Sequence, residues 1–110
     1  IVTAWDRYLG NDVVIAVVDD GVNPTHQDLA PGYLASGSYD FVGNATVPSG
    51  GSHGASVAGV AAGWGNNGIG VSGAAPRANH SGIKLALTSA DTDSRIANAL
   101  KYQNQINDIY

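Results

Sequence analysis

The sequence predicts an α/β fold with a central parallel sheet, and three of its segments carry that prediction. The β-branched run 13–18 lacks polar alternation, which is typical of a strand covered on both faces. Small residues fill 53–62 and favour a closely packed, buried helix. The segment 81–87 has the composition of a second parallel strand. Strand, helix and strand in this order form a βαβ unit, so we expect an α/β architecture.

The segments between these elements carry turn signals. Asn-Pro at 23–24 and Pro-Gly at 31–32 interrupt the chain after the first strand. Residues 39–42 alternate in polarity and predict a short strand before the Gly/Ser-rich loop 48–52. The loop 66–71 is rich in turn residues, and it separates the helix from the second parallel strand.

A last helix is predicted near the C-terminus. Asp91 or Thr92 can cap its first turn. Apolar residues recur near the helical period up to the end of the chain, at Ile96, Leu100, Ile106 and Ile109. A βαβ series would continue with another strand, for which we expect no residues to remain, and this would leave an unpaired sheet edge.

Composition and charge exclude several classes of protein. The 110 residues are 44% hydrophobic and 13% charged, which suits one compact core rather than two domains. The net charge is −4 and the five Lys and Arg residues are scattered, so no nucleic-acid partner is expected. The absence of cysteine excludes a disulfide framework, a thiolate metal site and a cysteine protease.

Membrane and targeting segments are not expected either. The longest apolar run, 13–18, is far shorter than the roughly 20 residues that span a bilayer, so no membrane span is predicted. The chain opens without Met and without a signal peptide, and we expect that it has been trimmed at its front.

One Asp and one His lie at positions where α/β folds usually place their functional residues. Asp19 directly follows the first predicted strand, at the carboxyl end of the sheet, where a buried charge needs a partner. His53 lies between a glycine-rich loop and a helix start. Asp19 can therefore orient the imidazole of His53, as the Asp of a catalytic triad orients its His. On spacing alone, a loop-capping Asp and a structural His are the alternative interpretation.

Three motifs, in wording and order, resemble the subtilases, the subtilisin-like serine proteases. They are VVDDG at 17–21, HGASVAG at 53–59 and NNGIGVSGAAP at 66–76, and the D-D-G form is that of the kexin and furin branch. The resemblance implies a three-layer subtilisin-like fold with a central parallel sheet, of which 1–110 would be the N-terminal portion of the catalytic domain. It also implies a serine endopeptidase that is secreted or extracytoplasmic and cleaves peptide or protein substrates.

The resemblance assigns roles to two triad residues and leaves the third unfilled. Asp19 would hold the tautomer of the imidazole, and His53 would be the general base and then the general acid. The family's G-T-S-x-x-x-P segment does not occur, and Ser56 is expected to pack or to bond its own backbone. We therefore expect a chain truncated before the catalytic Ser, inactive without the remainder of the same catalytic domain. The alternative is a non-catalytic or regulatory subtilase-like fragment.

Further residues are assigned to substrate binding by the resemblance. In the kexin branch the second Asp of D-D-G, here Asp20, borders the pocket for the residue before the one cleaved and favours Lys or Arg there. Thr88, Ser89 and Ala90 match the edge segment that subtilases pair with extended substrate. A solvated loop carboxylate is the alternative interpretation of Asp20.

The resemblance also implies a structural calcium ion. Asp28 matches a calcium-ligating Asp of the family, and the loop around Asn67 matches the segment that supplies the other oxygens. Hard oxygen ligands of this kind suit Ca²⁺, and no His or Cys ligand is implied. The remaining ligands would be carbonyls of Trp64, Ile69 and Val71, with Gly65 as the alternative to Trp64 because one residue is inserted before Asn66. A capped loop Asp and a turn Asn are the interpretation without a metal.

The sequence also contains a glycine-rich motif and two further histidines. The segment 68–73 fits G-x-G-x-x-G, but a nucleotide fingerprint needs a strand before it and a helix after it, and here a helix precedes and Pro76 follows. Nucleotide binding is therefore not favoured. His26 and His80 are expected to be loop and surface histidines.

Overall fold

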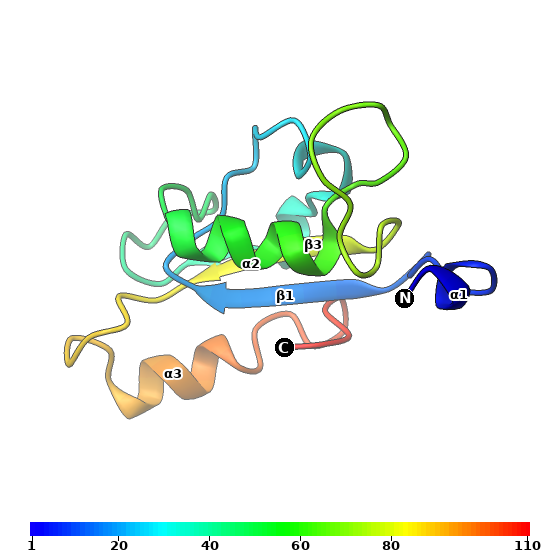
Figure 1. Cartoon of the computed structure of the whole chain (residues 1–110). Helices are drawn as coiled ribbons and strands as arrows, with labels where there is room; N and C mark the ends of the chain where they lie inside the picture. Colours follow the sequence, from blue (N-terminus) through cyan, green and yellow to red (C-terminus); the bar gives the residue numbers. More distant parts are fainter.

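The fold is seen in a computed structural model that describes residues 1–110 (Figure 1). Its elements in chain order are α1 (Val2–Trp5), β1 (Val14–Asp19), the 3₁₀ turns Ala30–Gly32 and Ala35–Gly37, β2 (Tyr39–Asp40), α2 (Ser52–Ala62), β3 (Asn79–Lys84) and α3 (Asp93–Ala99). No helix among them combines the length and the apolar character needed to cross a membrane.

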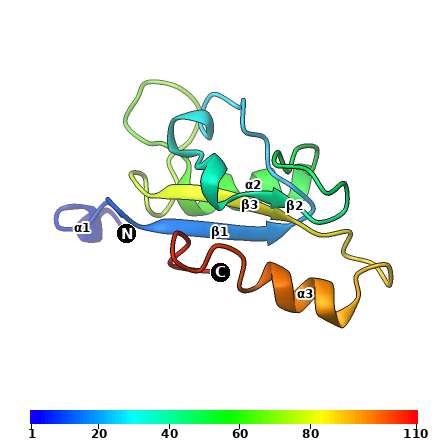
Figure 2. The ribbon, with the colours of Figure 1, turned by 180° about the vertical axis from the view of Figure 1, so that it is seen from behind.

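The three strands form one parallel sheet in the order β1-β3-β2. Figure 2 shows β2 beside β3, on the side away from β1. The register pairs Asp19 with Lys84 and Lys84 with Asp40, so these three residues lie in one row at the carboxyl ends of the strands. This edge is where open α/β sheets place their functional sites.

Separate apolar clusters cover the two faces of the sheet, so the fold has three layers (Figure 1). The cluster on the α2 face consists of Val17, Val22, Leu29 and Ala58. The cluster on the α3 face consists of Ala16, Ile83, Leu85 and Ala99. Neighbouring residues of β1 thus point to opposite faces, as the strand period of two requires. The predicted α/β architecture, with the first strand covered on both sides, is confirmed.

The composition of α2 predicts a buried helix, but in the structure only one face of α2 is buried. Only Gly54, Ala58 and Ala62 are buried, and their spacing of four places them on the face toward the sheet. Val57 and Val60 remain 39% and 75% exposed on the other side. The small residues allow close contact with the sheet, while the two valines leave an apolar surface uncovered.

The C-terminal segment differs from the helix predicted to run through Ile109. Helix α3 ends at Ala99, and the chain continues through turns in which Gln103 has a φ of +51°. Ile109 then forms a parallel bridge with Ile15, and its carbonyl accepts a hydrogen bond from Ala16 N at 2.7 Å. The free edge of β1 is therefore paired from Val14 to Ala16 and open beyond Ala16, so the expectation of an unpaired edge is only partly correct.

Two strands end earlier than predicted because carboxylate side chains accept hydrogen bonds from the backbone N–H groups that follow each strand. The run 39–42 gives only Tyr39–Asp40, since Asp40 Oδ1 accepts hydrogen bonds from the N–H groups of Val42 and Gly43, both at 2.8 Å. Strand β3 covers 79–84 rather than 81–87. It begins with two polar residues that a search for apolar runs passes over.

His80 is fully buried on β3, so its assignment to the surface is wrong. Neither ring nitrogen has a hydrogen-bond partner, and the ring centroid lies 5.9 Å from that of Tyr33. Burial lowers the pKa of His80 to about 4, because the charged imidazolium is disfavoured away from water.

Candidate active site

The predicted pair of Asp19 and His53 meets in the structure. Nδ1 of His53 lies 2.8 Å from Oδ2 and 3.0 Å from Oδ1 of Asp19, across 34 residues of sequence. An ionised carboxylate only accepts hydrogen bonds, so this contact places the imidazole proton on Nδ1 and leaves Nε2 with a lone pair. The geometry is therefore that of a base oriented by an acid.

The two partners differ in their exposure. The side chain of Asp19 is 11% exposed, whereas that of His53 is 72% exposed. Asp19 is fixed at the end of β1, where its Oδ1 also accepts the N–H of Asp20 at 2.7 Å. A buried, anchored carboxylate thus holds an imidazole that can reach groups in solution.

Asp20 points to the start of α2. Its Oδ1 accepts the backbone N–H of Gly54 at 2.8 Å. This hydrogen bond is the main reason that the pKa of Asp20 lies below its ordinary value, against the opposing effect of burial. Asp19 and the backbone and imidazole of His53 lower the pKa further. Asp20 is therefore held as a carboxylate beside the Asp19–His53 pair.

Glycine residues allow the end of β1 to approach α2 closely. A Cβ on Gly54 would overlap the carbonyl oxygen of Gly21, and a Cβ on Gly51 would overlap the carboxylate of Asp20. These contacts are with backbone or with a fixed side chain, so a larger residue has nowhere to go. Gly54 of the second motif and Gly51 just before it thus allow the close contact between strand and helix.

Lys84 supports the loop that leads to His53, a role that sequence reasoning missed. Its Nζ donates to the carbonyl of Ser49 at 2.9 Å and lies 3.8 Å from Oδ2 of Asp40. Lys84 is next to Asp19 in the sheet register. The signal in the sequence was that Lys84 is the only charged residue of the predicted strand segment 81–87.

Ser56 does not take part in the pair. Its Oγ donates to the carbonyl of Ser52 at 2.9 Å, within α2. The expectation that Ser56 bonds its own backbone is confirmed, and within residues 1–110 no serine is hydrogen-bonded to His53.

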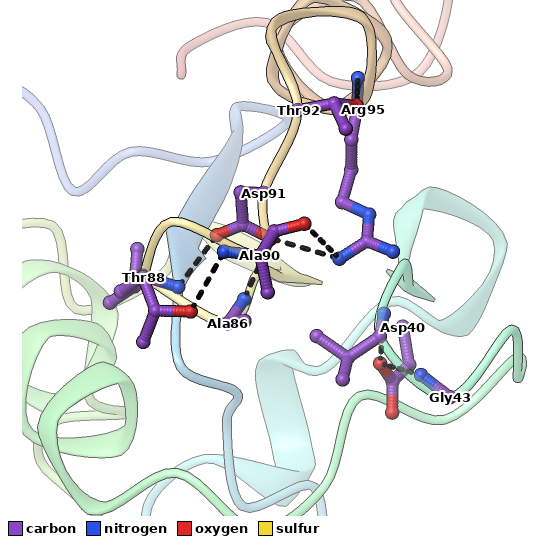
Figure 3. A network of polar contacts seen from close by, with 10 residues as sticks. Asp40, Gly43, Ala86, Thr88, Ala90, Asp91, Thr92 and Arg95 are labelled. Atoms are coloured by element: carbon purple, nitrogen blue, oxygen red, sulfur yellow. Dashed lines mark hydrogen bonds and ion pairs between the residues drawn. The ribbon is translucent and has the colours of Figure 1, made fainter.

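The segment Thr88–Ala90 forms a turn rather than an extended strand (Figure 3). The N–H of Asp91 donates to the carbonyl of Thr88 at 3.0 Å, and the N–H of Ala90 donates to Oγ1 of Thr88 at 3.2 Å. Ser89 lies exposed between them. The role of these three residues in substrate pairing stays a prediction.

Asp91 organises this turn, and sequence reasoning had considered it only as a helix cap (Figure 3). Its carboxylate accepts the N–H groups of Ala86 and Leu87 at 3.1 and 2.6 Å, and Nη1 of Arg95 at 3.1 Å. Burial would raise the pKa of Asp91, but these three donors together hold it below its ordinary value. The signal available was an Asp and an Arg spaced four residues apart.

Two of the predicted metal-binding residues, Trp64 and Val71, contact Asp28, whereas Asn67 is exposed and bonds only within its own loop. Its Oδ2 accepts the N–H of Val71 at 2.9 Å, and its backbone carbonyl accepts the N–H of Trp64 at 2.9 Å. Oδ1 is buried without a hydrogen-bond partner. The amide oxygen of Asn67 accepts the N–H of Ile69 at 3.2 Å.

The carboxylate of Asp28 offers an oxygen of the kind that a hard cation binds. A buried carboxylate oxygen with no partner is costly unless a cation or a donor meets it. Gly70 passes so close to Asp28 that a Cβ there would overlap the carboxylate. The amide oxygen of Asn67 has a second lone pair beyond the one given to Ile69. Asp28 also lines an open hollow of about 1000 Å³ between α2 and the loop 70–72.

The sequence matches the family profile described as "Subtilase family" (Peptidase_S8) over residues 10–110. It is 43% identical to the dibasic-processing endoprotease of Schizosaccharomyces pombe over 112 residues, which cover 96% of this chain and 15% of that protein. It is 39% identical to thermitase of Thermoactinomyces vulgaris over 101 residues, which cover 90% of this chain and 36% of that protein. The chain therefore spans only a minor part of the length of these relatives.

Solved structures give the same result for the fold. The serine protease of Aeromonas sobria superposes with a TM-score of 0.71 at 33% identity, over 91% of this chain and 17% of that one. A cold-adapted subtilisin-like serine proteinase superposes with a TM-score of 0.70 at 28% identity, over 90% of this chain and 34% of that one. The fold is therefore subtilisin-like, and by its sequence profile, its kexin-type relatives and its structural neighbours the chain belongs to the subtilase family.

Proposed function

We propose that this chain is the N-terminal portion of a catalytic domain and supplies the Asp and His of a serine endopeptidase triad. The observation that carries the proposal is the 2.8 Å contact between Nδ1 of His53 and Oδ2 of Asp19. The nucleophilic serine would come from outside residues 1–110. Membership in a family of serine proteases supports this role.

The proposed reaction uses the exposed imidazole as a proton carrier. Asp19 keeps the proton of His53 on Nδ1, so Nε2 is free to accept the proton of the attacking serine. The resulting imidazolium is stabilised by the adjacent carboxylate. His53 then returns the proton to the leaving amine, and a water molecule is activated in the same way in the second half of the reaction.

The test uses the intact protease with three variants. His53→Ala and Asp19→Asn are each expected to lower kcat about 10⁴-fold or more, as loss of a triad member does. Ser56→Ala is the matched control in the same helix and should keep wild-type activity. A fluorophosphonate probe should label one serine outside residues 1–110. Failure to label any serine, with no activity in the wild type, would leave the non-catalytic fragment as the correct description. Full activity of His53→Ala would show that His53 is not the catalytic base.

The finer part of the proposal is a preference for Lys or Arg at the substrate position before the cleaved residue. One oxygen of Asp20 accepts the Gly54 N–H, and the second is available to pair with a cation. The similarity to a dibasic-processing endoprotease supports this preference. Asp20→Asn should raise KM for a substrate with Lys at that position more than for one with Ala. Equal changes for both substrates would argue against a basic pocket.

We also propose that the loop around Asp28 holds a structural Ca²⁺. The side chains of Asp28 and Asn67 and the carbonyls of Trp64 (or Gly65), Ile69 and Val71 would be its ligands, and the ion would brace the loop after α2. The unpartnered, buried Oδ1 of Asp28 supports the site.

Calcium should raise the unfolding temperature of the wild-type chain and not that of Asp28→Asn. Asp6→Asn changes an exposed acid and serves as the charge-matched control. An equal response of Asp28→Asn and wild type to calcium would exclude this site.

The proposed partners are a peptide or protein substrate and the remainder of the same catalytic domain. The exposed Val57 and Val60 of α2, with Val60 lining the open hollow, support a packing contact on this face. We place the protein in a secreted or extracytoplasmic compartment by analogy with its family. Detection of the protein in a culture medium or periplasmic fraction, and not in a cytosolic one, is the test of that placement.

A further inference from the structure

The first turn of α2 has no cap of its own. Its N-cap residue is Gly51, which makes no side-chain hydrogen bond. The first N–H groups of any helix lack partners inside the helix, and an uncapped start is prone to fraying. His53 is the second residue of this turn. A loose start would therefore loosen the imidazole that must meet Asp19.

Asp20 supplies the missing hydrogen bond from outside the helix. Its Oδ1 lies 2.8 Å from the N–H of Gly54, the third residue of α2, which is where the side chain of an N-cap Ser or Asp would accept. A carboxylate beside a helix N-terminus is further favoured by the helix dipole. The cap is thus provided by the end of β1, 34 residues earlier in the sequence.

The glycine at the N-cap position is independent support for this arrangement. Gly51 has φ −89° and ψ 126°, a conformation open to any residue, so the backbone does not require glycine. Space does require it, because a Cβ there would overlap Oδ1 of Asp20 and approach the Asp20 carbonyl. The carboxylate of Asp20 thus occupies the place that an N-cap side chain would fill.

We propose that Asp20 is a positioning residue for His53, acting through the hydrogen bond from Gly54 that fixes the first turn of α2. This inference rests on the proposed protease function and assigns Asp20 a task separate from substrate recognition. Oδ1 serves the helix, and Oδ2 is the oxygen that can face a substrate cation. Because the same turn joins Asp19 to Asp20, one rigid segment holds both the partner of His53 and the helix that carries His53.

Two substitutions of Asp20 separate the two tasks. Asn keeps an Oδ1 that can accept from Gly54 but loses the charge, whereas Ala loses both. On a substrate with Ala before the cleaved residue, Asp20→Ala is expected to lower kcat about 10- to 100-fold, as small misplacements of catalytic groups do. Asp20→Asn should retain a kcat about tenfold or more above that of Asp20→Ala on this neutral substrate.

The outcomes distinguish this inference from the proposed function. If His53→Ala abolishes activity but Asp20→Ala keeps the wild-type kcat, the positioning role is wrong and the triad stands. If His53→Ala keeps activity, the proposed function itself is wrong. If Asp20→Ala and Asp20→Asn lose kcat equally, the charge acts rather than the hydrogen bond, and the inference is overturned. Thr92→Ala, which removes the cap of α3, controls for lost helix stability and should leave kcat unchanged.

A measurement on the unmodified protein covers the case in which Asp20→Ala fails to fold. The N–H of Gly54 has an acceptor, whereas that of Ser52 has none in the structure. Amide hydrogen exchange followed by NMR should therefore be about tenfold or more slower at Gly54 than at Ser52. Exchange at Gly54 as fast as at Ser52 would overturn the inference without any substitution.

Discussion

The first turns of α2 and α3 are held in opposite ways. At α3, Oγ1 of Thr92 accepts the N–H of Arg95 at 3.1 Å, three residues along the chain. At α2 the N-cap is Gly51, and the acceptor is Asp20, which lies on another element. The start of α3 is set by its own sequence, whereas the start of α2 is set by the end of β1. The helix that carries the His53 imidazole is thus the one tied to the strand that carries Asp19.

This difference shows how the contact between Asp19 and His53 can be maintained. A locally capped helix can shift as a unit against its sheet without losing its cap. For α2 such a shift breaks the Asp20–Gly54 bond and the Asp19–His53 contact together. Tight backbone contacts and a shared turn therefore couple the stability of this helix start to the geometry of the site.

The largest effect is expected from a substitution that prevents α2 from approaching the end of β1 at Gly54. In Gly54→Ala the new Cβ would overlap the carbonyl of Gly21 and lie 3.0 Å from Cβ of Asp19, so the free energy of unfolding should fall by more than about 3 kcal/mol. Gly59→Ala is the matched control, because it lies in the same helix with open space around it and should stabilise by up to about 1 kcal/mol. Urea unfolding measures both. Equal stability of the two variants would mean that α2 does not contact β1 as described.

Acid should weaken the α2 side of the sheet before the α3 side. His80 lies beside Tyr33, which packs against the α2-face cluster, and burial lowers the pKa of His80 to about 4 from 6.5. A depressed imidazole pKa means that the unfolded chain binds the proton first, so stability is full above about pH 6.5 and falls as the pH drops toward 4. Between about pH 7.5 and about pH 5 the loss should be about 2 kcal/mol.

Amide exchange in the two helices at these two pH values measures this effect. Protection factors, which correct for the slower intrinsic exchange in acid, should fall more in α2 than in α3, and His80→Leu, which cannot titrate, should abolish the difference. An acid response of the same size in His80→Leu as in the wild type would show that other groups are responsible.

The smallest expected effect is the loss of the local cap. Thr92→Ala should lower the free energy of unfolding by about 1 kcal/mol, because one N–H at the start of α3 loses its acceptor. Thr92→Ser keeps a hydroxyl acceptor and should recover most of that loss. The Asp19–His53 contact, monitored by the NMR signal of the Nδ1 proton, should be the same in both variants. Loss of that signal in Thr92→Ala would show that the two helix starts are coupled.

The parts of the molecule that sequence reasoning predicted well are those with a local signal. The run 13–18 marked β1 to within one residue, and the small residues from His53 onward marked α2. The motifs also brought Asp19 and His53 to the correct places. Of the two cap candidates for α3, Thr92 is the one that caps.

The parts that were missed depend on contacts between distant segments. The apolar period through Ile106 and Ile109 looked helical, but Ile109 is placed by the edge of β1. The sequence does not reveal that His80 is buried, because its burial comes from Tyr33 and the loop around it rather than from an apolar run. The cap that Asp20 provides to α2 has no sequence signal, since donor and acceptor come from different elements.

The pairing of β1 carries a consequence for the speed of folding. Val14 pairs with Asn79, and its N–H also bonds the side chain of Asp108, 94 residues away. When the paired residues of a sheet are this far apart in the sequence, long loops must close before strand pairing contributes favourable free energy. This requirement makes folding slow. The Asp19–His53 contact also joins distant segments, so we expect it to form later in folding than the local first turn of α3.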